Sequence, residues 1–396
     1  MKVLIATVTC GAGHLAAARA IEEAWKAQRP ADTVQTVDVL DLAPKLIRKL
    51  YVDGYVKLIE HVPEVYAYAF KKSDNPAKLR KTLEFRRAVS HQTVRGFAKL
   101  LAEFQPDVVL CPHYLPVEII GHLKEKGRFS ARTVCIVTDF EAHAFWLDPA
   151  ADLYCVAADE TKASLVSRGI NKAKVVVTGI PIASKFQQPV NVLEVRKRYG
   201  LRDDIPTLLV LGGGFGMGPV GEILAELDKL EGHFQTLVVA GRNEELRKQL
   251  AVQDRSHATD VLGFSRNMHE LMTVSDLLIT KPGGLTSSEA LALGKPLFIL
   301  NPIPGQEAAN SDYLLAHGAG VKVNRVEDLN FQLRKLLGTP KLAEMAASAK
   351  ALGKPSAAKS VVEATLSLLA SPASSPAPEP EKPRSLLAKL RSKKST

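Results

Sequence analysis

Cysteine is scarce in this 396-residue chain, whose four cysteines stand at positions 10, 111, 135 and 155. Their wide spacing, without any Cys-x-x-Cys pair, excludes a disulfide scaffold and a cysteine-based metal site. Long apolar runs are also missing, since no segment approaches the roughly 18–20 apolar residues that a membrane-spanning helix needs. The short apolar run at 3–9 leads into glycines and a helical pattern, so we interpret it as a buried strand and not as a signal peptide. These features predict a reduced, cytoplasmic protein.

Negative charge is in short supply as well. The chain carries 52 Lys and Arg against 42 Asp and Glu, which gives a net charge of +10 and a pI near 9.3. This excess predicts an anionic partner, such as nucleic acid, a phosphate-bearing ligand or an acidic membrane surface. The hydrophobic fraction of 46% and the charged fraction of 24% exclude a wholly disordered chain. A chain of this length is expected to form two domains.

Short apolar runs alternate with helical stretches along most of the chain. Because the runs are apolar on both faces, they indicate strands of parallel sheets that helices cover on both sides. Two sets of six strands, one in each half, predict an α/β protein with two doubly wound, Rossmann-like domains. The expected strands span residues 3–9, 34–39, 107–111, 133–138, 152–157 and 174–178 in the first half, and 207–211, 235–240, 259–262, 276–280, 296–300 and 320–324 in the second.

Two regions depart from this pattern. Residues 71–99 contain nine basic residues against two acidic ones, which indicates either a solvated helix face or a contact with an anionic surface. Residues 371–383 contain five prolines and are expected to form a linker. The basic segment 384–394 would place three leucines on one helical face, as in a short membrane-surface anchor, and a frayed soluble tail is the alternative.

Glycine-rich turns follow several of the expected strands. Gly11, Gly13 and His14 stand where the first strand passes into a helix, whose start favours negative charge. His14 would lie at the carboxyl edge of the sheet, where open α/β folds bind ligands and an imidazole can serve as a base. The alternative is a histidine that only caps the helix. A second turn, at 211–218, holds five glycines and predicts a cradle of backbone amides for phosphate oxygens.

Two further turns offer polar side chains to the same edge of the second sheet. In the first of them, Glu289 either closes a capping box with Thr286 or accepts hydrogen bonds from ribose hydroxyls, and the sequence leaves both interpretations open. In the next turn, Gln306 and Glu307 would project into the cleft as partners for sugar hydroxyls. Glu307 could instead serve only to compensate the helix dipole.

Asp139 and His143 follow the strand expected at 133–138 and resemble a pair of metal ligands. No third ligand stands at metal-site spacing, and the chain has no Asp-x-Asp pair of the kind that many nucleotide-sugar enzymes use to hold a divalent ion. We therefore expect a metal-independent site without a cofactor. In such a site, helix dipoles and backbone amides carry the charge of a diphosphate.

The order of these motifs resembles that of one enzyme family. The motifs are Gly11-Ala12-Gly13-His14, the stretch from Thr138-Asp139-Phe140 to Trp146, Gly179-Ile180-Pro181-Ile182, the glycine loop 212–218, Lys281-Pro282-Gly283-Gly284 and Pro304-Gly305-Gln306-Glu307. On these motifs the chain resembles the diacylglycerol glycosyltransferases of glycosyltransferase family 28, both the plant-type monogalactosyldiacylglycerol synthases and the bacterial processive diacylglycerol glucosyltransferases. It is more distantly similar to the N-acetylglucosaminyltransferase that makes lipid II. The likeness covers about residues 1–345.

This resemblance implies a GT-B fold, in which two Rossmann-like domains face each other across a cleft. A pair of glutamines is usual in the lipid-II enzyme where this chain has Gln306-Glu307, and that departure favours the glycerolipid branch. The implied parts are an acceptor-binding, membrane-facing domain at 1–181, a UDP-sugar-binding domain at 182–355, a helix crossing back to the first domain at 356–370, and a proline-rich linker with a basic tail at 371–396.

The resemblance also implies roles for individual residues. His14 would lie on the acceptor side and either remove the proton of the acceptor hydroxyl or position that hydroxyl, and Asp139 is the second catalytic candidate. Phe264 would face the uracil and Glu289 the ribose. The implied UDP-sugar contacts are Gly213, Gly214, Phe215, Phe264, Lys281, Gly283, Gly284, Thr286, Glu289, Gln306, Glu307 and Asn310. The implied acceptor-side residues are Gly11, Gly13, His113, Phe140, His143 and Trp146.

The implied reaction is an inverting transfer of a hexose, glucose or galactose, from UDP-hexose to diacylglycerol, which gives a β-glycosyldiacylglycerol. The enzyme would be cytoplasmic and bound peripherally to an anionic membrane surface, which explains the net positive charge. The alternatives are a UDP-sugar 2-epimerase of the same fold, an N-acetylglucosaminyltransferase of the lipid-II type and a non-catalytic UDP-sugar sensor. Nucleic-acid binding would explain the charge but not the glycine turns, so no nucleic-acid partner is expected.

Overall fold

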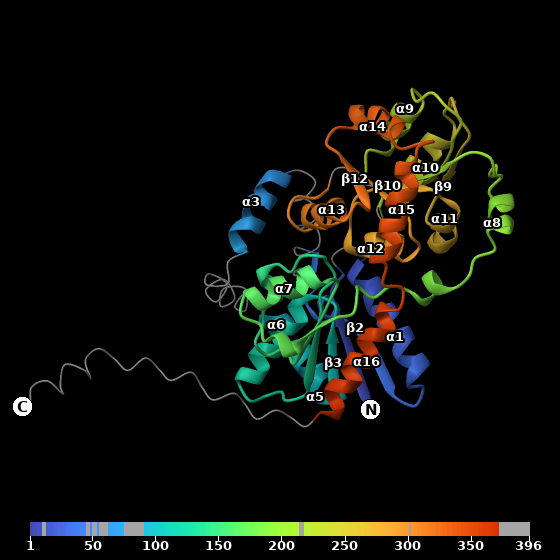
Figure 1. The fold of residues 1–396 in the computed structure, drawn as a ribbon. Helices are drawn as coiled ribbons and strands as arrows, with labels where there is room; N and C mark the ends of the chain where they lie inside the picture. The colour runs from blue at the N-terminus through green and yellow to red at the C-terminus, as the bar shows by residue number, and fades with distance from the viewer. Residues whose placement is uncertain are drawn as a thin grey trace, which may run out of the picture.

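Two six-stranded parallel β-sheets organise the chain, one in each half (Figure 1). The computed structural model describes residues 1–9, 13–44, 48–49, 54, 62–74, 91–213, 218–300 and 302–371. Each expected strand overlaps an observed one, and helices pack on both faces of each sheet. The predicted α/β class is confirmed.

The first sheet has the strand order β2-β1-β3-β4-β5-β6 with all neighbours parallel. The order reverses between β1 and β3, and open α/β sheets bind ligands at the carboxyl ends of strands at such a switch point. The strands are β1 (Lys2–Thr7), β2 (Thr33–Asp38), β3 (Val108–Cys111), β4 (Arg132–Ile136), β5 (Leu153–Val156) and β6 (Val175–Val177). Helices α1 (Gly13–Gln28), α5 (His91–Phe104), α6 (Tyr114–Glu125) and α7 (Asp159–Ser167) connect them, with short 3-10 turns η1 (Val39–Leu42), η2 (Ala144–Trp146) and η3 (Lys172–Lys174).

The second sheet has the order β12-β11-β10-β7-β8-β9, again parallel, and its switch point lies between β7 and β10. The strands are β7 (Thr207–Leu211), β8 (Gln235–Val239), β9 (Thr259–Leu262), β10 (Leu277–Thr280), β11 (Leu297–Leu300) and β12 (Gly320–Val323). The helices of this half are α8 (Val192–Arg198), α9 (Val220–Leu227), α10 (Glu244–Ala251), α11 (Met268–Val274), α12 (Gly284–Ala292), α13 (Gln306–Ala316), α14 (Leu329–Arg334) and α15 (Pro340–Leu352), with 3-10 turns η4 (Ser184–Gln187) and η5 (Val326–Asp328).

Burial on both faces explains why these strands are continuous apolar runs. All four side chains of β3 are inaccessible to solvent. Val109 packs in the same cluster as Leu4, whereas the next residue, Leu110, packs with Ile5 on the opposite face. Successive side chains of a strand point to opposite faces, so a sheet covered on both sides requires an apolar residue at every position.

The chain returns from the second half to the first at its end. Helix α15 packs on α12, whereas α16 (Ala357–Ala370) packs along α1, beside which it lies in Figure 1. Val361 and Val362 of α16 are fully buried in the same cluster as Ile21 and Trp25 of α1. The two halves are thus joined by two passages of the backbone.

Helix α3 (Pro63–Ser73) stands apart from both sheets, at the side of the junction between the halves (Figure 1). It packs on neither sheet and instead contacts the loop after β4 and the start of α13. No helix in the part of the chain that the structure describes is both long enough and apolar enough to cross a membrane.

Candidate active site

A cavity of about 550 Å³ opens between the two halves, at the carboxyl edge of the first sheet. Its walls are the turns after β1, β3 and β4, the helix α3, and the beginning of α13. Apolar side chains alternate with carboxylates, a lysine and two imidazoles, so the cavity can hold a molecule with an apolar part and hydroxyl groups. The lining residues are His14, Ala67, Phe70, Lys71, Asp74, Tyr114, Asp139, Glu141, His143, Phe145, Trp146, Gly305, Gln306, Ala308, Ala309 and Asp312.

His14 stands in the first turn of α1 and lines this cavity. Its Nδ1 lies 2.9 Å from the carbonyl oxygen of Pro112 and 3.0 Å from Oγ1 of Thr138. A carbonyl can only accept, so Nδ1 carries the proton and Nε2 is the basic nitrogen. Burial lowers the pKa of His14 to about 4, although the bond to Pro112 opposes the shift. The imidazole is therefore neutral at neutral pH and able to accept a proton.

The loop after β4 carries the second catalytic candidate, Asp139, and this loop is held between the two halves. Asn310 of α13 donates to Oδ1 of Asp139 at 3.1 Å and accepts from the backbone N–H of Phe140 at 2.8 Å. The start of α12 comes so close that a Cβ on Gly284 would overlap the carbonyl oxygen of Thr138. Burial raises the pKa of Asp139 to about 6, and the Asn310 amide opposes that shift.

Aromatic rings form the apolar wall of the cavity beside His14. Tyr114 stacks on His113 with ring centroids 4.3 Å apart and packs against Phe145 at 5.2 Å and Trp146 at 6.0 Å. His113 is buried, caps α6 through its Nδ1, and meets the ring of His14 edge to face at 4.7 Å. The structure therefore brings two expected acceptor-side residues, His113 and Trp146, to the side of His14.

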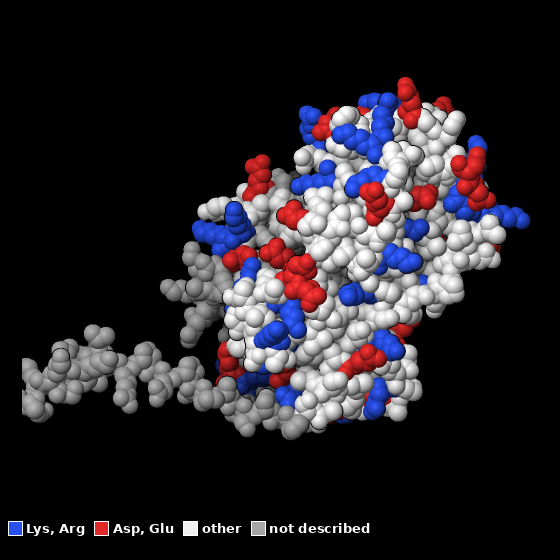
Figure 2. Space-filling model, viewed as in Figure 1, with Lys and Arg blue, Asp and Glu red and all other residues white. Residues whose placement is uncertain are grey.

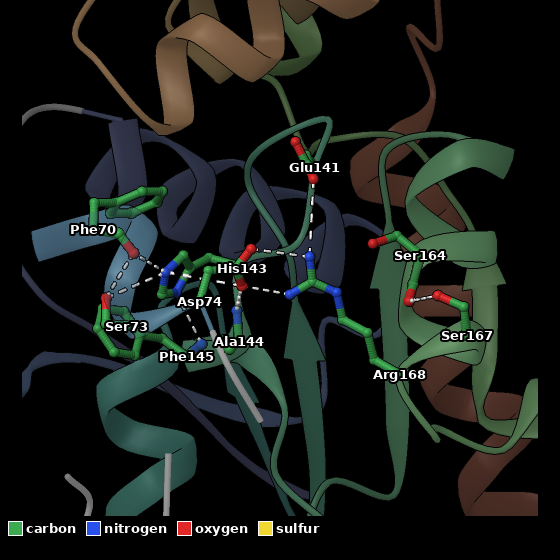
Figure 3. Close-up of polar contacts among 10 residues, drawn as sticks. All are labelled: Phe70, Ser73, Asp74, Glu141, His143, Ala144, Phe145, Ser164, Ser167 and Arg168. Atoms are coloured by element: carbon green, nitrogen blue, oxygen red, sulfur yellow. Dashed lines mark hydrogen bonds and ion pairs between the residues drawn. The ribbon is translucent and has the colours of Figure 1, made fainter. Parts of the chain in front are cut away.

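A charged cluster at the end of α3 holds that helix against the first half (Figure 3). Asp74, the C-cap residue of α3, accepts from both terminal nitrogens of Arg168, one of them at 3.1 Å. The backbone N–H of Ala144 donates to the same carboxylate at 2.8 Å, and Glu141 lies 3.9 Å from Arg168. Although burial works in the opposite direction, the guanidinium and this N–H hold the pKa of Asp74 below its usual range. The charged form of Asp74 is thus the form that anchors α3.

His143 joins α3 to the loop after β4 (Figure 3). Its Nε2 donates to the carbonyl oxygen of Phe70 at 3.0 Å, while its Nδ1 accepts from the N–H of Phe145 at 3.1 Å. The rings of Phe70 and His143 pack with centroids 4.1 Å apart. Phe70 also lies so close to Gly305 of the second half that any side chain there would overlap the ring. Gly305 also has a φ of +98°, a conformation that favours glycine.

The first turn of α13 brings the expected sugar contacts to the junction. Gln306 lines the cavity and accepts a hydrogen bond from the hydroxyl of Tyr66 of α3 at 3.3 Å. Glu307 points back to its own loop, where its Oε2 accepts from the N–H of Ile303 at 2.7 Å. Burial raises the pKa of Glu307, while the bond to Ile303 and the charge of Lys281 oppose the shift. Gln306 is thus the side chain of this pair on the cavity wall.

The capping box considered for Thr286 and Glu289 does not form. Helix α12 begins earlier, with Gly283 as its N-cap residue and no side-chain hydrogen bond to the helix start. Thr286 and Glu289 therefore lie inside the helix. Burial raises the pKa of Glu289 to about 7, and the charge of Lys185 opposes the shift. The capping-box interpretation is therefore excluded, and the contact of Glu289 with a ribose stays a prediction.

Other expected UDP-sugar contacts lie away from the cavity, along the carboxyl edge of the second sheet. Lys281 follows β10, and Gly213 follows β7 with a φ of +76°. Phe264 follows β9, is 58% exposed, and lies 5.5 Å from the guanidinium of Arg242. An exposed ring at this place is available for stacking on a base. Three expected residues, Gly11, Gly214 and Phe215, lie outside the described part of the chain.

The cavity wall also includes residues that the sequence did not single out. Tyr114 directly follows His113 at the carboxyl end of β3, and this position was a usable signal. Phe70 and Asp74 gave no such signal as wall residues, because α3 reaches the cavity only through its contacts with the loop after β4 and with α13. Arg168 does not line the cavity and acts on it through Asp74.

Comparison with known proteins follows the division into two halves. Residues 14–182 match the family described as monogalactosyldiacylglycerol (MGDG) synthase, and residues 207–361 match the glycosyltransferase family 28 C-terminal domain. A processive diacylglycerol beta-glucosyltransferase of Staphylococcus saprophyticus is 30% identical to the chain over 373 residues, which cover 93% of each protein. The enzyme of the same name from Bacillus pumilus is 29% identical over 368 residues, which cover 91% of this chain and 94% of the relative.

Solved structures share the arrangement of both halves. MurG of Acinetobacter baumannii superposes with a TM-score of 0.62 at 18% identity, covering 92% of this chain and 99% of that one. A UDP-GlcNAc 2-epimerase from Neisseria meningitidis, bound to UDP-GlcNAc, also has a TM-score of 0.62, at 17% identity, covering 93% of this chain and all of that one. At these identities the likeness establishes the fold alone. That fold is the GT-B arrangement implied by the motifs, which is confirmed.

Proposed function

The chain belongs to the family of the processive diacylglycerol beta-glucosyltransferases, and from this membership we propose its reaction. It is a UDP-sugar-dependent, inverting glycosyltransferase that moves a hexose from UDP-hexose to the free hydroxyl of diacylglycerol and forms a β-glycosyldiacylglycerol. The observation that carries the proposal is the cavity between the halves, where a neutral imidazole, an apolar wall and the start of α13 meet.

His14 serves as the base on the acceptor side. Its Nε2 takes the proton of the acceptor hydroxyl while the hydroxyl oxygen attacks the anomeric carbon, and the bond from that carbon to UDP breaks on the opposite face. One such displacement inverts the configuration and converts an α-linked donor into a β-glycoside. Asp139 lines the same cavity, and although burial raises its pKa to about 6, its carboxylate is ionised above that pH and then favours the positive charge that develops at the anomeric carbon.

The second half holds the UDP-sugar. Phe264 stacks on the uracil and Glu289 accepts from the ribose. Gln306 on the cavity wall binds the sugar hydroxyls, and Glu307 joins it through the carboxylate oxygen that does not accept from Ile303. Gly213 and the amides at the start of α12 stabilise the diphosphate, because helix starts and glycine turns present N–H groups to anions. Among the described residues, no group of three or more His, Cys, Asp and Glu side chains is placed to hold a metal ion. We propose that the leaving diphosphate is stabilised without one.

The chemistry of the cavity fits an acceptor that is largely hydrocarbon. Tyr114, Phe145 and Trp146 provide an apolar wall next to the imidazole of His14. A UDP-sugar 2-epimerase needs no second substrate and no such wall, so this feature favours a transferase. The pair Gln306-Glu307, in place of two glutamines, favours a glycerolipid acceptor over the lipid-II type.

The membrane surface is approached by α3. Val65 and Tyr68 on its outer side are 57% and 67% exposed, and Val62 just before the helix is 43% exposed. Lys72 lies 5.5 Å from the ring of Tyr68, and Figure 2 shows basic side chains gathered at this end of α3. Apolar rings and branched side chains beside lysines suit the interface of an anionic bilayer. The enzyme is therefore expected to bind the membrane peripherally, on its cytosolic face.

One experiment tests the reaction directly. The protein is incubated with diacylglycerol vesicles and radiolabelled UDP-glucose or UDP-galactose, with and without EDTA, and the lipids are then separated. We expect label in a lipid whose sugar a β-glycosidase releases, and we expect EDTA to leave the rate largely unchanged. Isomerised UDP-sugar without labelled lipid would refute the proposal, and a complete, metal-reversible loss with EDTA would refute the metal-independent site.

A further inference from the structure

We propose that Asn310 is a positioning residue, which reaches from the second half into the first and sets the loop of Thr138, Asp139 and Phe140 that bears the acceptor-side chemistry. This inference rests on the function proposed for the cavity. It changes the role that the sequence suggests for Asn310, from a sugar contact to a bridge between the two halves.

The amide of Asn310 is completely buried and occupied on both sides. Its Oδ1 accepts from the backbone N–H of Phe140 at 2.8 Å. Its Nδ2 donates to Oδ1 of Asp139 and to the carbonyl oxygen of Pro282, both at 3.1 Å. The reverse orientation of the amide would face an N–H with an NH₂ group and two acceptors with an oxygen, so the partners determine its orientation.

Contacts around Asn310 hold the same loop from two more directions. Tyr313, one turn further along α13, stacks on Phe140 with ring centroids 4.4 Å apart and an interplanar angle of 16°. Gly284 at the start of α12 touches the carbonyl oxygen of Thr138. All of these groups belong to the second half, and the loop that they hold belongs to the first.

The position of this loop determines the positions of the two catalytic candidates, His14 and Asp139. Oγ1 of Thr138 lies 3.0 Å from Nδ1 of His14, and Asp139 lines the cavity. Gln306 stands one turn before Asn310 on α13, so a single helix carries a sugar contact on the cavity wall and the bridge to Asp139. The sugar donor is held by the second half and the catalytic base by the first, so the reaction requires that the two halves are correctly positioned relative to each other. Asn310 fixes this relative position by binding the Asp139 loop to α13.

A direct test of the bridge needs no enzymatic activity. Hydrogen exchange is measured over the loop in the full-length protein, the Asn310→Ala variant and the Asn310→Asp variant. Ser311→Ala is the matched control, because the Ser311 hydroxyl is also buried on α13 and makes no hydrogen bond with the described residues. We expect faster exchange at the Phe140 amide in Asn310→Ala. Asn310→Asp retains an oxygen for that amide but places a second oxygen against the acceptors of Asp139 and Pro282, so its exchange rate should lie between those of Asn310→Ala and the wild type, whereas Ser311→Ala should exchange at the wild-type rate.

Kinetics then separate positioning from sugar binding. Removing the amide should lower kcat about 10²-fold, the cost that a small misplacement of reacting groups can have, and leave UDP affinity within about twofold. The acid limb of the pH–rate profile should move to higher pH in both Asn310 variants, by on the order of one pH unit, because the amide stabilises the ionised form of Asp139. The other titratable groups that line the cavity with Asp139 are His14, Lys71, Asp74, Tyr114, Glu141, His143 and Asp312, and the buried Glu307 interacts with Asp139 electrostatically; all of them are unchanged in the variants.

The outcomes are distinct. An unchanged exchange rate at Phe140 in Asn310→Ala would overturn the bridge, whatever reaction the protein performs. Faster exchange with unaltered kcat and pH profile would overturn its role in catalysis, and a raised KM for UDP-hexose with an unshifted profile would return Asn310 to the sugar site. A wild-type protein that transfers no sugar to diacylglycerol would refute the proposed function, while the exchange experiment would still decide whether Asn310 bridges the halves.

Discussion

Single side chains in the cavity have proton equilibria that differ from those of the same groups in water. Burial lowers the pKa of His14 to about 4 and raises that of Asp139 to about 6. At neutral pH the imidazole is therefore uncharged and the carboxylate ionised, so one is ready to accept a proton and the other to stabilise positive charge. Both pKa shifts follow from the burial of these residues between the two halves, which favours the uncharged form of each group.

We expect His14→Ala to lower kcat by a factor of about 10²–10⁴, the usual loss on removing a general base, with little change in UDP affinity. His14→Asn is the matched variant, since its amide can still donate to Pro112 but it lacks a basic nitrogen. Turnover on diacylglycerol vesicles and calorimetric titration with UDP provide the two measurements. Full activity of the Asn variant would remove His14 from the proton transfer and leave it a structural role.

Glu289 offers a second prediction at this scale. If Glu289 accepts from the ribose, Glu289→Gln should weaken UDP binding roughly tenfold, and the variant should fold as well as the wild type. Because burial raises the pKa of Glu289 to about 7, the folded protein holds a proton that the unfolded chain loses above pH 4.5. This contribution to stability is present below pH 4.5 and disappears as the pH rises through 7, and the Gln variant, whose amide does not titrate, should not show this pH dependence.

Calorimetry in buffers of different ionisation enthalpy checks the same residue. Ribose hydroxyls would favour the ionised carboxylate, so UDP binding near pH 7 should release more protons from the wild type than from Glu289→Gln. The difference between the two proteins removes the contribution of the UDP phosphates. Equal proton release and equal affinity would mean that Glu289 does not touch the nucleotide.

At the scale of elements, α3 is unusual because it lies on no sheet. Its place depends on the contacts of Asp74 with Arg168 and of Phe70 with His143, which Figure 3 shows. It also depends on the close approach of Phe70 to Gly305. These contacts make one helix a wall of the cavity and a link between the acceptor side and the start of α13. A bidentate pair between Arg and a carboxylate has the geometry to hold such an element in one position.

We therefore expect Arg168→Ala to raise the KM for diacylglycerol and to lower kcat, so that kcat/KM falls about tenfold, while UDP affinity remains unchanged. Arg168→Lys should recover only part of the loss, because a lysine cannot form the two parallel bonds. Arg325→Ala is the matched control, since Arg325 makes a similar pair with Asp328 in the second half, away from the cavity. If Arg168→Ala and Arg325→Ala both behaved as the wild type, the position of α3 would not depend on Asp74.

At the scale of the whole molecule, two strongly basic regions of the sequence, 71–99 and 382–394, are the ones that we propose contact an anionic membrane, and most of their residues lie outside the described part of the chain. Each Lys or Arg near an anionic bilayer contributes about 1 kcal/mol, and less as salt rises. Vesicle binding should therefore increase with anionic lipid and decrease with salt. Neutralising Lys78, Arg80, Lys81, Arg86 and Arg87 together should weaken binding more than deleting 372–396, because the proline-rich sequence before the basic tail predicts a linker, and a linker loses conformational entropy on docking.

Vesicle sedimentation of both variants, at two salt concentrations, measures this ranking. A truncated protein that loses binding while the neutralised protein keeps it would make the tail the main anchor. Val65→Ser and Tyr68→Ser on α3 test the apolar contribution separately, since they should weaken binding at high salt, where charge is screened. Val252→Ser is their control, as Val252 is 83% exposed in the second half.

Local information in the chain was enough to predict the two sheets and the turns that follow their strands. A strand buried on both faces must be apolar at every position, as β3 is. A turn such as Gly283-Gly284 is recognisable because its glycines stand between the end of an apolar strand and the start of a helix. His14 and Gln306 were found in this way, since each follows a strand and reaches the cavity wall through its own short turn, whereas Trp146 was implied only by the family resemblance.

The partners of these residues could not be read from the chain, because they depend on contacts between segments far apart in sequence. The bridge from Asn310 to Asp139 spans 171 positions, and the pair of Asp74 with Arg168 spans 94. The capping box of Thr286 and Glu289 is a local pattern that the packing of α12 against the Thr138 loop overrode, since the helix starts earlier, where Gly284 meets Thr138. Strand and turn signals act over a few residues, whereas burial, protonation and the walls of the cavity arise only when the two halves meet.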